Sequence, residues 1–150
     1  MQAVSADDVT SVAAAYPLII PVLNPGLEAP VYADGDYGYD AGLSQVLSAT
    51  LEADTQYDLS VLVGNPVLYN EGLTADYRIE LLAGGVLLAS DTGPSPVDDT
   101  TWATVSLSYN SGANPAQLGL PLEIRLLAVD FTDWYEVNFD DVKLGYVTIK

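Results

Sequence analysis

The stretch that decides the fold runs from Tyr57 to Asn65 and reads YDLSVLVGN. Every second position from Tyr57 to Val63 is apolar, and the positions between hold Asp58, Ser60 and Leu62. A period of two places alternate side chains on opposite faces of a β-strand. We therefore expect one face of this strand to lie in a core and the other to tolerate water.

Strands of the same kind fill most of the chain on both sides of this stretch. Each is a short alternating or apolar run bounded by Gly, Pro, Asn or Asp, and Gly84-Gly85 between two runs predicts a tight hairpin. About eight to ten such strands are typical of an antiparallel β-sandwich. The single helix candidate, Ala6 to Tyr16, is short and poorly capped. The other expected strands are Leu43–Leu51, Asp76–Gly85, Val86–Ser90, Thr101–Asn110, Leu122–Val129 and a last strand that includes Val137–Leu144.

The composition excludes several classes of function. The chain of 150 residues suffices for one domain, and it contains no His and no Cys, so the commonest general base and the thiolate ligands are missing. Its formal net charge of −17 argues against nucleic-acid binding, which needs clustered Lys and Arg to neutralise phosphates. No run approaches the roughly 18 apolar residues of a membrane span. We expect neither nucleic acid nor membrane insertion.

The N-terminal residues differ from the rest of the chain. They are small and apolar from Val12 to Ile20 and show no strand alternation. We expect residues 1–22 to form an extended arm and residues 23–150 to form the sandwich domain. Asp7 and Asp8 stand where a secretory signal has basic residues. Either a signal has been removed, or the protein is made and used without one.

The last expected strand, EVNFDDVKL, breaks its own alternation. Val137 and Phe139 share one face, but the apolar series resumes at Val142, one position out of step. A β-bulge produces such a shift, because it inserts one extra residue into a strand. We therefore expect a bulge at Asp140-Asp141.

Several stretches resemble one known family. They resemble bacterial extracellular jelly-roll domains related to carbohydrate-binding modules of the galactose-binding-like type. The resemblance covers most of residues 23–145 and implies an all-β, antiparallel jelly-roll β-sandwich. Such domains carry a longer aromatic segment where this chain has only VYADGDYGYDAG at 31–42, so a sugar-binding platform is expected to be reduced or absent. The matching stretches are NPGLEAP (24–30), LSQVLSATLEADTQYDLSVLVGN (43–65), YRIELLAGG (77–85), PLEIRL (121–126) and VNFDDVKL (137–144).

The resemblance also implies a structural calcium ion. In similar jelly rolls a carboxylate of the final strand joins the Glu of the opening motif around Ca²⁺, which accepts mixed carboxylate and carbonyl ligands. Mapped onto this chain, the ligands are Glu28 and Asp140, with Asp141 as a less certain participant. Alternatively, Asp140 and Asp141 face solvent on an edge strand, where charge blocks pairing with another sheet.

Two pairs of aromatic residues are candidates for ligand binding or for an interface. Tyr37 and Tyr39 lie in a Gly-Asp turn, where they can stack on a sugar ring or on a neighbouring subunit. Trp134 and Tyr135 precede the last strand, where they are corner packing if buried and interface anchors if exposed.

Two hypotheses on function follow, and neither includes catalysis. We expect a non-enzymatic structural module that assembles in many copies on a larger particle, with virion decoration or a capsid-associated role favoured. The N-terminal arm is expected to contact copies of the chain or other assembly proteins. The alternative is a calcium-stabilised carbohydrate-binding or adhesion module that binds glycans. The expected location is a virion surface, or an extracellular or cell surface.

Overall fold

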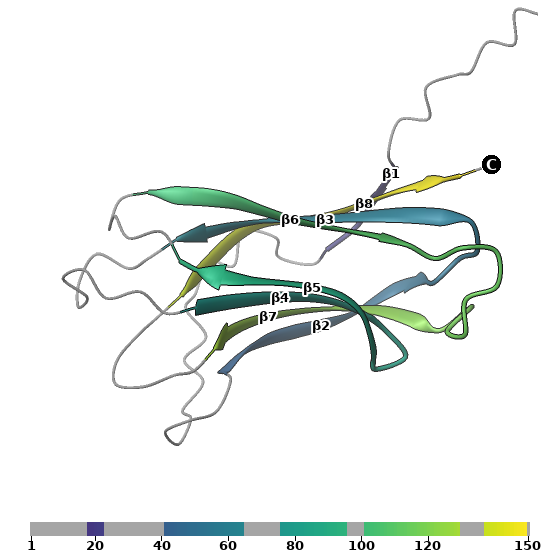
Figure 1. Ribbon diagram of the computed structural model, residues 1–150, viewed down its shortest axis with the longest axis horizontal. Helices are drawn as coiled ribbons and strands as arrows, with labels where there is room; N and C mark the ends of the chain where they lie inside the picture. Colours follow the sequence, from purple (N-terminus) through teal and green to yellow (C-terminus); the bar gives the residue numbers. More distant parts are fainter. Residues whose placement is uncertain (1–17, 23–40, 65–75, 96–100, 130–136, 150) are drawn as a thin grey trace, which may run out of the picture.

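The computed structural model describes residues 18–22, 41–64, 76–95, 101–129 and 137–149. Within these ranges the chain forms two antiparallel four-stranded sheets that face each other (Figure 1). Sheet A has the order β1-β8-β3-β6, and sheet B has the order β2-β7-β4-β5. This confirms the predicted all-β jelly-roll sandwich. The strands are β1 (Leu18–Ile20), β2 (Ala41–Thr50), β3 (Thr55–Gly64), β4 (Asp76–Ala83), β5 (Val86–Pro94), β6 (Trp102–Asn110), β7 (Pro121–Val129) and β8 (Asn138–Thr148).

Strand β3, which contains the stretch quoted first, lies inside sheet A between β8 and β6. Its alternate residues Tyr57, Leu59, Val61 and Val63 are at most 1% exposed and belong to the hydrophobic core. Each fully buried aliphatic side chain of this size contributes about 1.5–3 kcal/mol to folding. The prediction that one face of this strand is core is therefore confirmed.

The hairpin between β4 and β5 turns at two glycines. Gly84 has φ 57° and Gly85 has φ 79°, a left-handed conformation that residues with a Cβ atom rarely adopt. A two-residue turn with positive φ at both positions matches the right-handed twist of the flanking strands. The Gly84 N–H also donates to the carbonyl oxygen of Pro121 at 2.9 Å, which fastens the turn to β7. The predicted hairpin is confirmed.

The pairing between β3 and β8 shifts by one residue. Ser60 pairs with Lys143, whereas Leu62 pairs with Asp140, so β8 contains one extra residue between these pairs. Asp141 has φ 49°, and its N–H donates to Oδ1 of Asp140 at 2.6 Å. The bulge predicted at Asp140-Asp141 is therefore confirmed. It returns the apolar residues that follow it to the core.

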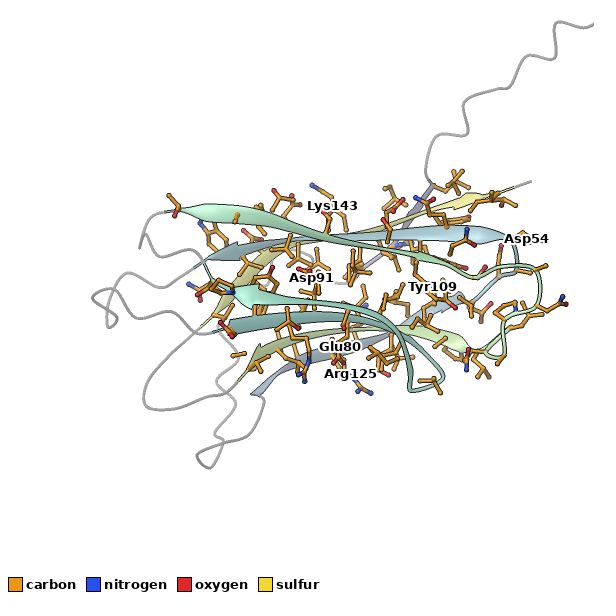
Figure 2. The ribbon with its side chains drawn as sticks, in the orientation of Figure 1. Asp54, Glu80, Asp91, Tyr109, Arg125 and Lys143 are labelled. Carbon is orange, nitrogen blue, oxygen red and sulfur yellow. The ribbon has the colours of Figure 1, made fainter. Side chains whose placement is uncertain are left out.

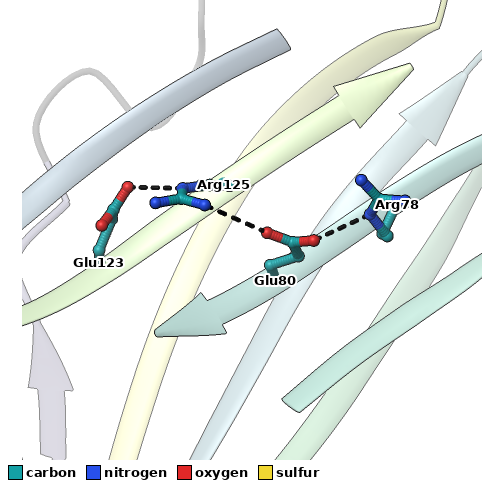
Figure 3. A network of polar contacts seen from close by, with 4 residues as sticks. All are labelled: Arg78, Glu80, Glu123 and Arg125. Atoms are coloured by element: carbon teal, nitrogen blue, oxygen red, sulfur yellow. Dashed lines mark hydrogen bonds and ion pairs between the residues drawn. The ribbon is translucent and has the colours of Figure 1, made fainter. Parts of the chain in front are cut away.

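The outer face of sheet B carries a network of ion pairs (Figure 3). The Glu80 carboxylate, at 10% side-chain exposure, lies 2.8 Å from Nε of Arg78 and 3.9 Å from Nη1 of Arg125. Nε of Arg125 lies 2.7 Å from Oε1 of Glu123. The hydrogen bond to Glu123 and the negative charges of Glu123 and Glu80 raise the pKa of Arg125. Two cations and two anions balance, so we assign this network to holding β4 against β7.

One end of the sandwich, the Asp76 end, is where β4 begins and β3, β5 and β7 end. Asp76 pairs with Pro94 of β5 and with Val129 of β7, and Gly64 of β3 pairs with Trp102 of β6. These strand ends lie together on the left of Figure 1. Polar groups near the Asp76 end are therefore brought together from several strands.

Strand β1 falls within the range predicted as an arm. It forms the edge of sheet A, where Leu18 pairs with Tyr146 and Ile20 pairs with Leu144. The other residues of the predicted arm, with its helix candidate, lie outside the described residues. In the described part of the chain there is no helix with the length and hydropathy to cross a membrane.

Candidate functional site

The inner face of β5 becomes polar as the strand approaches the Asp76 end. Asp91 pairs with Ile79, a fully buried core residue, so its carboxylate is directed between the two sheets. Figure 2 shows Asp91 in the space between the layers. Positions 91, 93 and 95 are less exposed than the residues between them, and Ser95 is only 2% exposed. A core strand would carry apolar residues there, so the polar series indicates a site.

Tyr77 joins Asp91 from the neighbouring strand. The Tyr77 hydroxyl donates a hydrogen bond to Oδ2 of Asp91 at 2.8 Å. Tyr77 pairs with Gly93, and a Cβ atom at position 93 would lie 3.1 Å from the phenol oxygen. The missing side chain at Gly93 therefore lets the Tyr77 side chain lie across β5 and reach Asp91.

The surroundings keep Tyr77 protonated. Burial, the hydrogen bond to Asp91 and the negative charge of that carboxylate together raise the pKa of Tyr77 to about 12. At neutral pH the phenol of Tyr77 is consequently protonated, and it is the donor of the hydrogen bond that Oδ2 of Asp91 accepts. A positioned carboxylate with a hydrogen-bonded phenol can accept, hold and return a proton, which is general acid–base chemistry.

Ser95 adds a third polar group directly after the end of β5. Its hydroxyl is buried and has no hydrogen-bond partner among the described residues. This part of the chain therefore offers a carboxylate at Asp91, backbone without a side chain at Gly93, and a hydroxyl at Ser95. We take these residues with Tyr77 as the candidate site.

A hollow of about 300 Å³ lies away from these residues, between β1 and the end of β2. Its lining includes Ile19, Ser48, Glu52, Tyr57 and Tyr146. The Tyr57 hydroxyl accepts the backbone N–H of Glu52 at 2.8 Å, and its ring stacks on Tyr146 with centroids 6.3 Å apart. Burial raises the pKa of Tyr57. These contacts fasten the turn between β2 and β3, which forms one wall of this hollow.

The predicted calcium ligands are only partly described. Oδ1 of Asp140 accepts the N–H of Asp141, while the carboxylate of Asp141 pairs with Lys143. Among the described residues no three His, Cys, Asp or Glu side chains form a group that could hold a metal ion. Glu28 lies outside the described residues, as do the aromatic candidates Tyr37, Tyr39, Trp134 and Tyr135. Of the predicted site residues the structure describes only Asp140 and Asp141, which are neighbours at the β8 bulge.

The sequence analysis missed the site on β5, although a signal was present. In the stretch SDTGPS (90–95) the residues Asp91, Gly93 and Ser95 stand at every second position, directly after the apolar run Val86–Ala89. The predicted strand ended at Ser90, because Asp, Gly and Pro are typical of turns. Continuing the alternation past Ser90 would have placed all three on one face.

Comparisons with known proteins point to one family. The HpiC1-like family, described as HpiC1 cyclase, matches residues 10–145. The Stig cyclase Fisc from Fischerella sp. TAU, in complex with (3Z)-3-(1-methyl-2-pyrrolidinylidene)-3H-indole, has a similar structure. Its TM-score is 0.75 at 23% identity, over 90% of this chain and 100% of that chain. None of the curated proteins compared matches this chain.

Two further cyclase structures are similar. The apo form of a cyclase from Fischerella sp. has a TM-score of 0.73 at 23% identity, over 89% of this chain and 98% of that one. A cyclase from Fischerella sp. TAU in complex with 4-(1H-indol-3-yl)butan-2-one has a TM-score of 0.69 at 30% identity. That match covers 79% of this chain and 63% of the other.

These matches correct the expectations on function. A non-enzymatic virion or capsid module is contradicted, as is the carbohydrate-binding or adhesion alternative, because the matching family consists of cyclases, which are enzymes. The resemblance to extracellular jelly-roll domains was right about the fold and wrong about the family. Most of its motif residues that the structure describes lie in strands of the sandwich, so the resemblance reports on the fold. The absence of His and Cys misled as well, because Asp and Tyr can also move protons. The expected partners and location stay predictions.

Proposed function

Because this chain belongs to the HpiC1-like cyclase family, we propose that it is a cyclase with its reacting centre at the Tyr77–Asp91 pair. The observation that carries the proposal is a carboxylate between two sheets, hydrogen-bonded to a phenol of raised pKa. Perturbed titratable groups facing a protein interior are typical of functional sites.

We propose an indole as the aromatic part of the substrate. Two of the similar cyclases hold indole compounds, a 3H-indole and an indolyl butanone. The candidate site suits such a ligand, because the ring of Tyr77 offers an aromatic surface beside the carboxylate of Asp91.

Ring closure as an isomerisation consumes one double bond of the substrate and moves one proton. A new C–C bond forms between a ring carbon and an unsaturated side-chain carbon, the ring carbon loses its proton, and the other carbon of the double bond gains one. Asp91 accepts and returns that proton in this proposal. The Tyr77 hydroxyl holds the carboxylate by the 2.8 Å hydrogen bond and keeps its orientation.

The test is turnover of an indole that carries an unsaturated side chain, followed by chromatography and mass spectrometry for a product of unchanged mass. We expect Asp91→Asn to lower kcat by about 100-fold or more, the scale of general acid–base catalysis. Asp58→Asn is the matched control, because Asp58 is a half-buried carboxylate on the outer face of sheet A, bonded to Gln56 and Ser108. An Asp91→Asn variant that turns over like wild type would contradict the assignment. Activity lost instead in Asp140→Asn would locate the site at the β8 bulge.

Calcium is a separate proposal. We propose that Glu28 and Asp140 hold a structural Ca²⁺ ion; Asp140 supports this with one carboxylate oxygen that is not engaged by the Asp141 N–H. Asp141 fits less well, because Lys143 already neutralises it. Calorimetric titration with Ca²⁺ should show one site in wild type that Asp140→Asn weakens. A melting temperature unchanged by EDTA, with no heat of binding, would contradict the calcium proposal. The alternative that these aspartates protect an edge strand needs correction too, because β8 lies between β1 and β3.

A further inference from the structure

The hollow between β1 and the end of β2 reaches the surface of the protein. Its β1 wall runs from the solvent into the core, because Ile19 is 64% exposed whereas Ile20 is 5% exposed. Its volume of about 300 Å³ is at the lower limit of the pockets that hold small molecules in proteins. A ligand of few heavy atoms therefore fits, and the chemistry of the walls decides its class.

The described walls of the hollow carry one negative charge and no positive one. Among the described lining residues only Glu52 is charged, and its side chain is exposed. Its carboxylate has no ion-pair partner in the described part of the chain, where the cations Arg78, Arg125 and Lys143 pair with other carboxylates. Opposite charges attract, so a cation is the kind of ligand that this hollow favours.

The hydroxyl of Tyr57 lies beside this carboxylate. It accepts the backbone N–H of Glu52 at 2.8 Å, and Tyr57 is 1% exposed. Burial is the main cause that raises the pKa of Tyr57; the N–H of Glu52 lowers this pKa, and the negative charge of the Glu52 side chain raises it. The phenol is therefore protonated at neutral pH. Its hydroxyl donates to no oxygen among the described residues, so one buried donor at the hollow is unused.

Two stacked tyrosine rings form the aromatic part of the walls. The rings of Tyr57 and Tyr146 have centroids 6.3 Å apart, and both residues line the hollow. The face of such a ring attracts an ammonium group. A metal ion is a poorer match, because Ca²⁺ takes several oxygen ligands and the described residues gather no three His, Cys, Asp or Glu side chains. An ammonium ion requires only one carboxylate and an aromatic face.

We propose that this hollow is a second binding site, which takes a small organic ammonium ion with a hydroxyl group next to it. The ammonium group donates to the Glu52 carboxylate and lies against the ring of Tyr146. The ligand's hydroxyl oxygen accepts the unused hydrogen of the Tyr57 hydroxyl. The inference goes beyond the proposed function and does not depend on it.

The test uses ethanolamine, which is protonated at neutral pH, and ethylene glycol as an uncharged ligand of the same size. NMR titrations at constant ionic strength follow the backbone amides of wild type, Glu52→Gln and Asp76→Asn. Glu52→Gln removes the charge but keeps the backbone N–H that Tyr57 accepts. Asp76→Asn is the matched control, because Asp76 is an exposed carboxylate that pairs with Val129, at the end of β7 away from this hollow.

We expect ethanolamine to shift the amides of residues 48–52 and 146 in a saturable way, and ethylene glycol to leave them unchanged. Glu52→Gln should weaken the binding of ethanolamine by about 10-fold or more, the size of one hydrogen bond to a charged group. Asp76→Asn should bind like wild type, and the unshifted part of each spectrum confirms folding.

Three outcomes would overturn the inference. The first is equal binding of the two ligands, because the site would then not recognise the ammonium group. The second is an equal loss of binding in Glu52→Gln and Asp76→Asn. The third is a set of shifts that spread over the surface without saturation. The last two would show that ethanolamine is only a counterion of a chain with net charge −17.

Discussion

A carboxylate between two β-sheets is costly at the scale of the single residue, because a buried charge loses its hydration. Asp91 is stabilised by the Tyr77 hydroxyl, and the missing side chain at Gly93 makes that contact possible. Each of the two polar groups needs the other, because either one left alone would be half-buried without this bond. The pair is therefore expected to be strongly coupled in stability.

A double-mutant cycle measures this coupling. Asp91→Leu alone should lower the free energy of unfolding by about 1–3 kcal/mol, because it leaves the Tyr77 hydroxyl unsatisfied. The double variant Tyr77→Phe/Asp91→Leu should recover most of that loss, since both polar groups are then replaced by apolar ones. Urea unfolding of wild type, of the single variants Asp91→Leu and Tyr77→Phe, and of the double variant gives the four free energies of unfolding. Additive single effects would show that the two side chains are not coupled.

The raised pKa of Tyr77 makes a prediction for alkaline pH. The folded pKa of about 12 exceeds the ordinary value of 10.0, so this phenol adds stability below pH 10 that is lost as the pH rises toward 12. Stopped-flow pH jumps followed by tyrosinate absorbance should show the late ionisation of Tyr77 in wild type. The Tyr77→Phe variant should lack that ionisation. Tyr57, whose pKa is also raised, should remain in the variant. Identical titrations of the two proteins would contradict the assignment.

At the scale of the element, most strands follow from the sequence, and β5 shows where this fails. Alternation and turn residues located six strands and the Gly84-Gly85 hairpin closely. β5 was expected to end at Ser90, but its pairing with β4 continues to Pro94. Ladder hydrogen bonds to a neighbouring strand override the weak strand preference of Asp and Gly, and an edge strand tolerates Pro. The site was missed because it lies in this extension.

The contact between Tyr77 and Asp91 could not be read from the sequence for a second reason. The two residues are 14 positions apart, and only the register of β4 with β5 brings them together. The bulge in β8 could be predicted, because it displaces the apolar series within a single strand. A pattern of apolar residues in the sequence predicts the structure of a single strand. A site such as the Tyr77–Asp91 pair depends on how two strands pair, which such a pattern does not give.

The bulge residue Asp141 gives a prediction of its own. At φ 49° a residue with a Cβ atom is strained, by roughly 1–2 kcal/mol, and a β-branched one most of all. Asp141→Gly should therefore be neutral or slightly stabilising, whereas Asp141→Val should destabilise by about 1–2 kcal/mol or more. The exposed ion pair with Lys143 that both variants lose is worth little. Chemical denaturation of both variants measures the difference, and equal stabilities would argue against the left-handed conformation.

At the scale of the whole molecule, charge opposes folding. The net charge of −17 makes the compact chain repel itself, and salt screens that repulsion within a Debye length of about 10 Å at 0.1 M. We expect the melting temperature to rise from low salt to 0.5 M NaCl. The network around Glu80 is weakened by the same screening, but its charges balance and are few. A melting temperature that falls or stays constant would show that ion pairs outweigh the repulsion.

Strand β5 is an edge strand of sheet B, and Asp91 and Gly93 of the candidate site lie on it. A replacement at position 91, 93 or 95 therefore disturbs one neighbouring strand, whereas the same change in β4 or β7 would disturb two. Mutations on this edge strand can therefore change the reaction while the other strands of sheet B keep the protein folded. Libraries that keep Asp91 and Gly93, on which the hydrogen bond of Tyr77 depends, and vary the other residues at this end of β5 should accordingly contain a high share of well-expressed proteins.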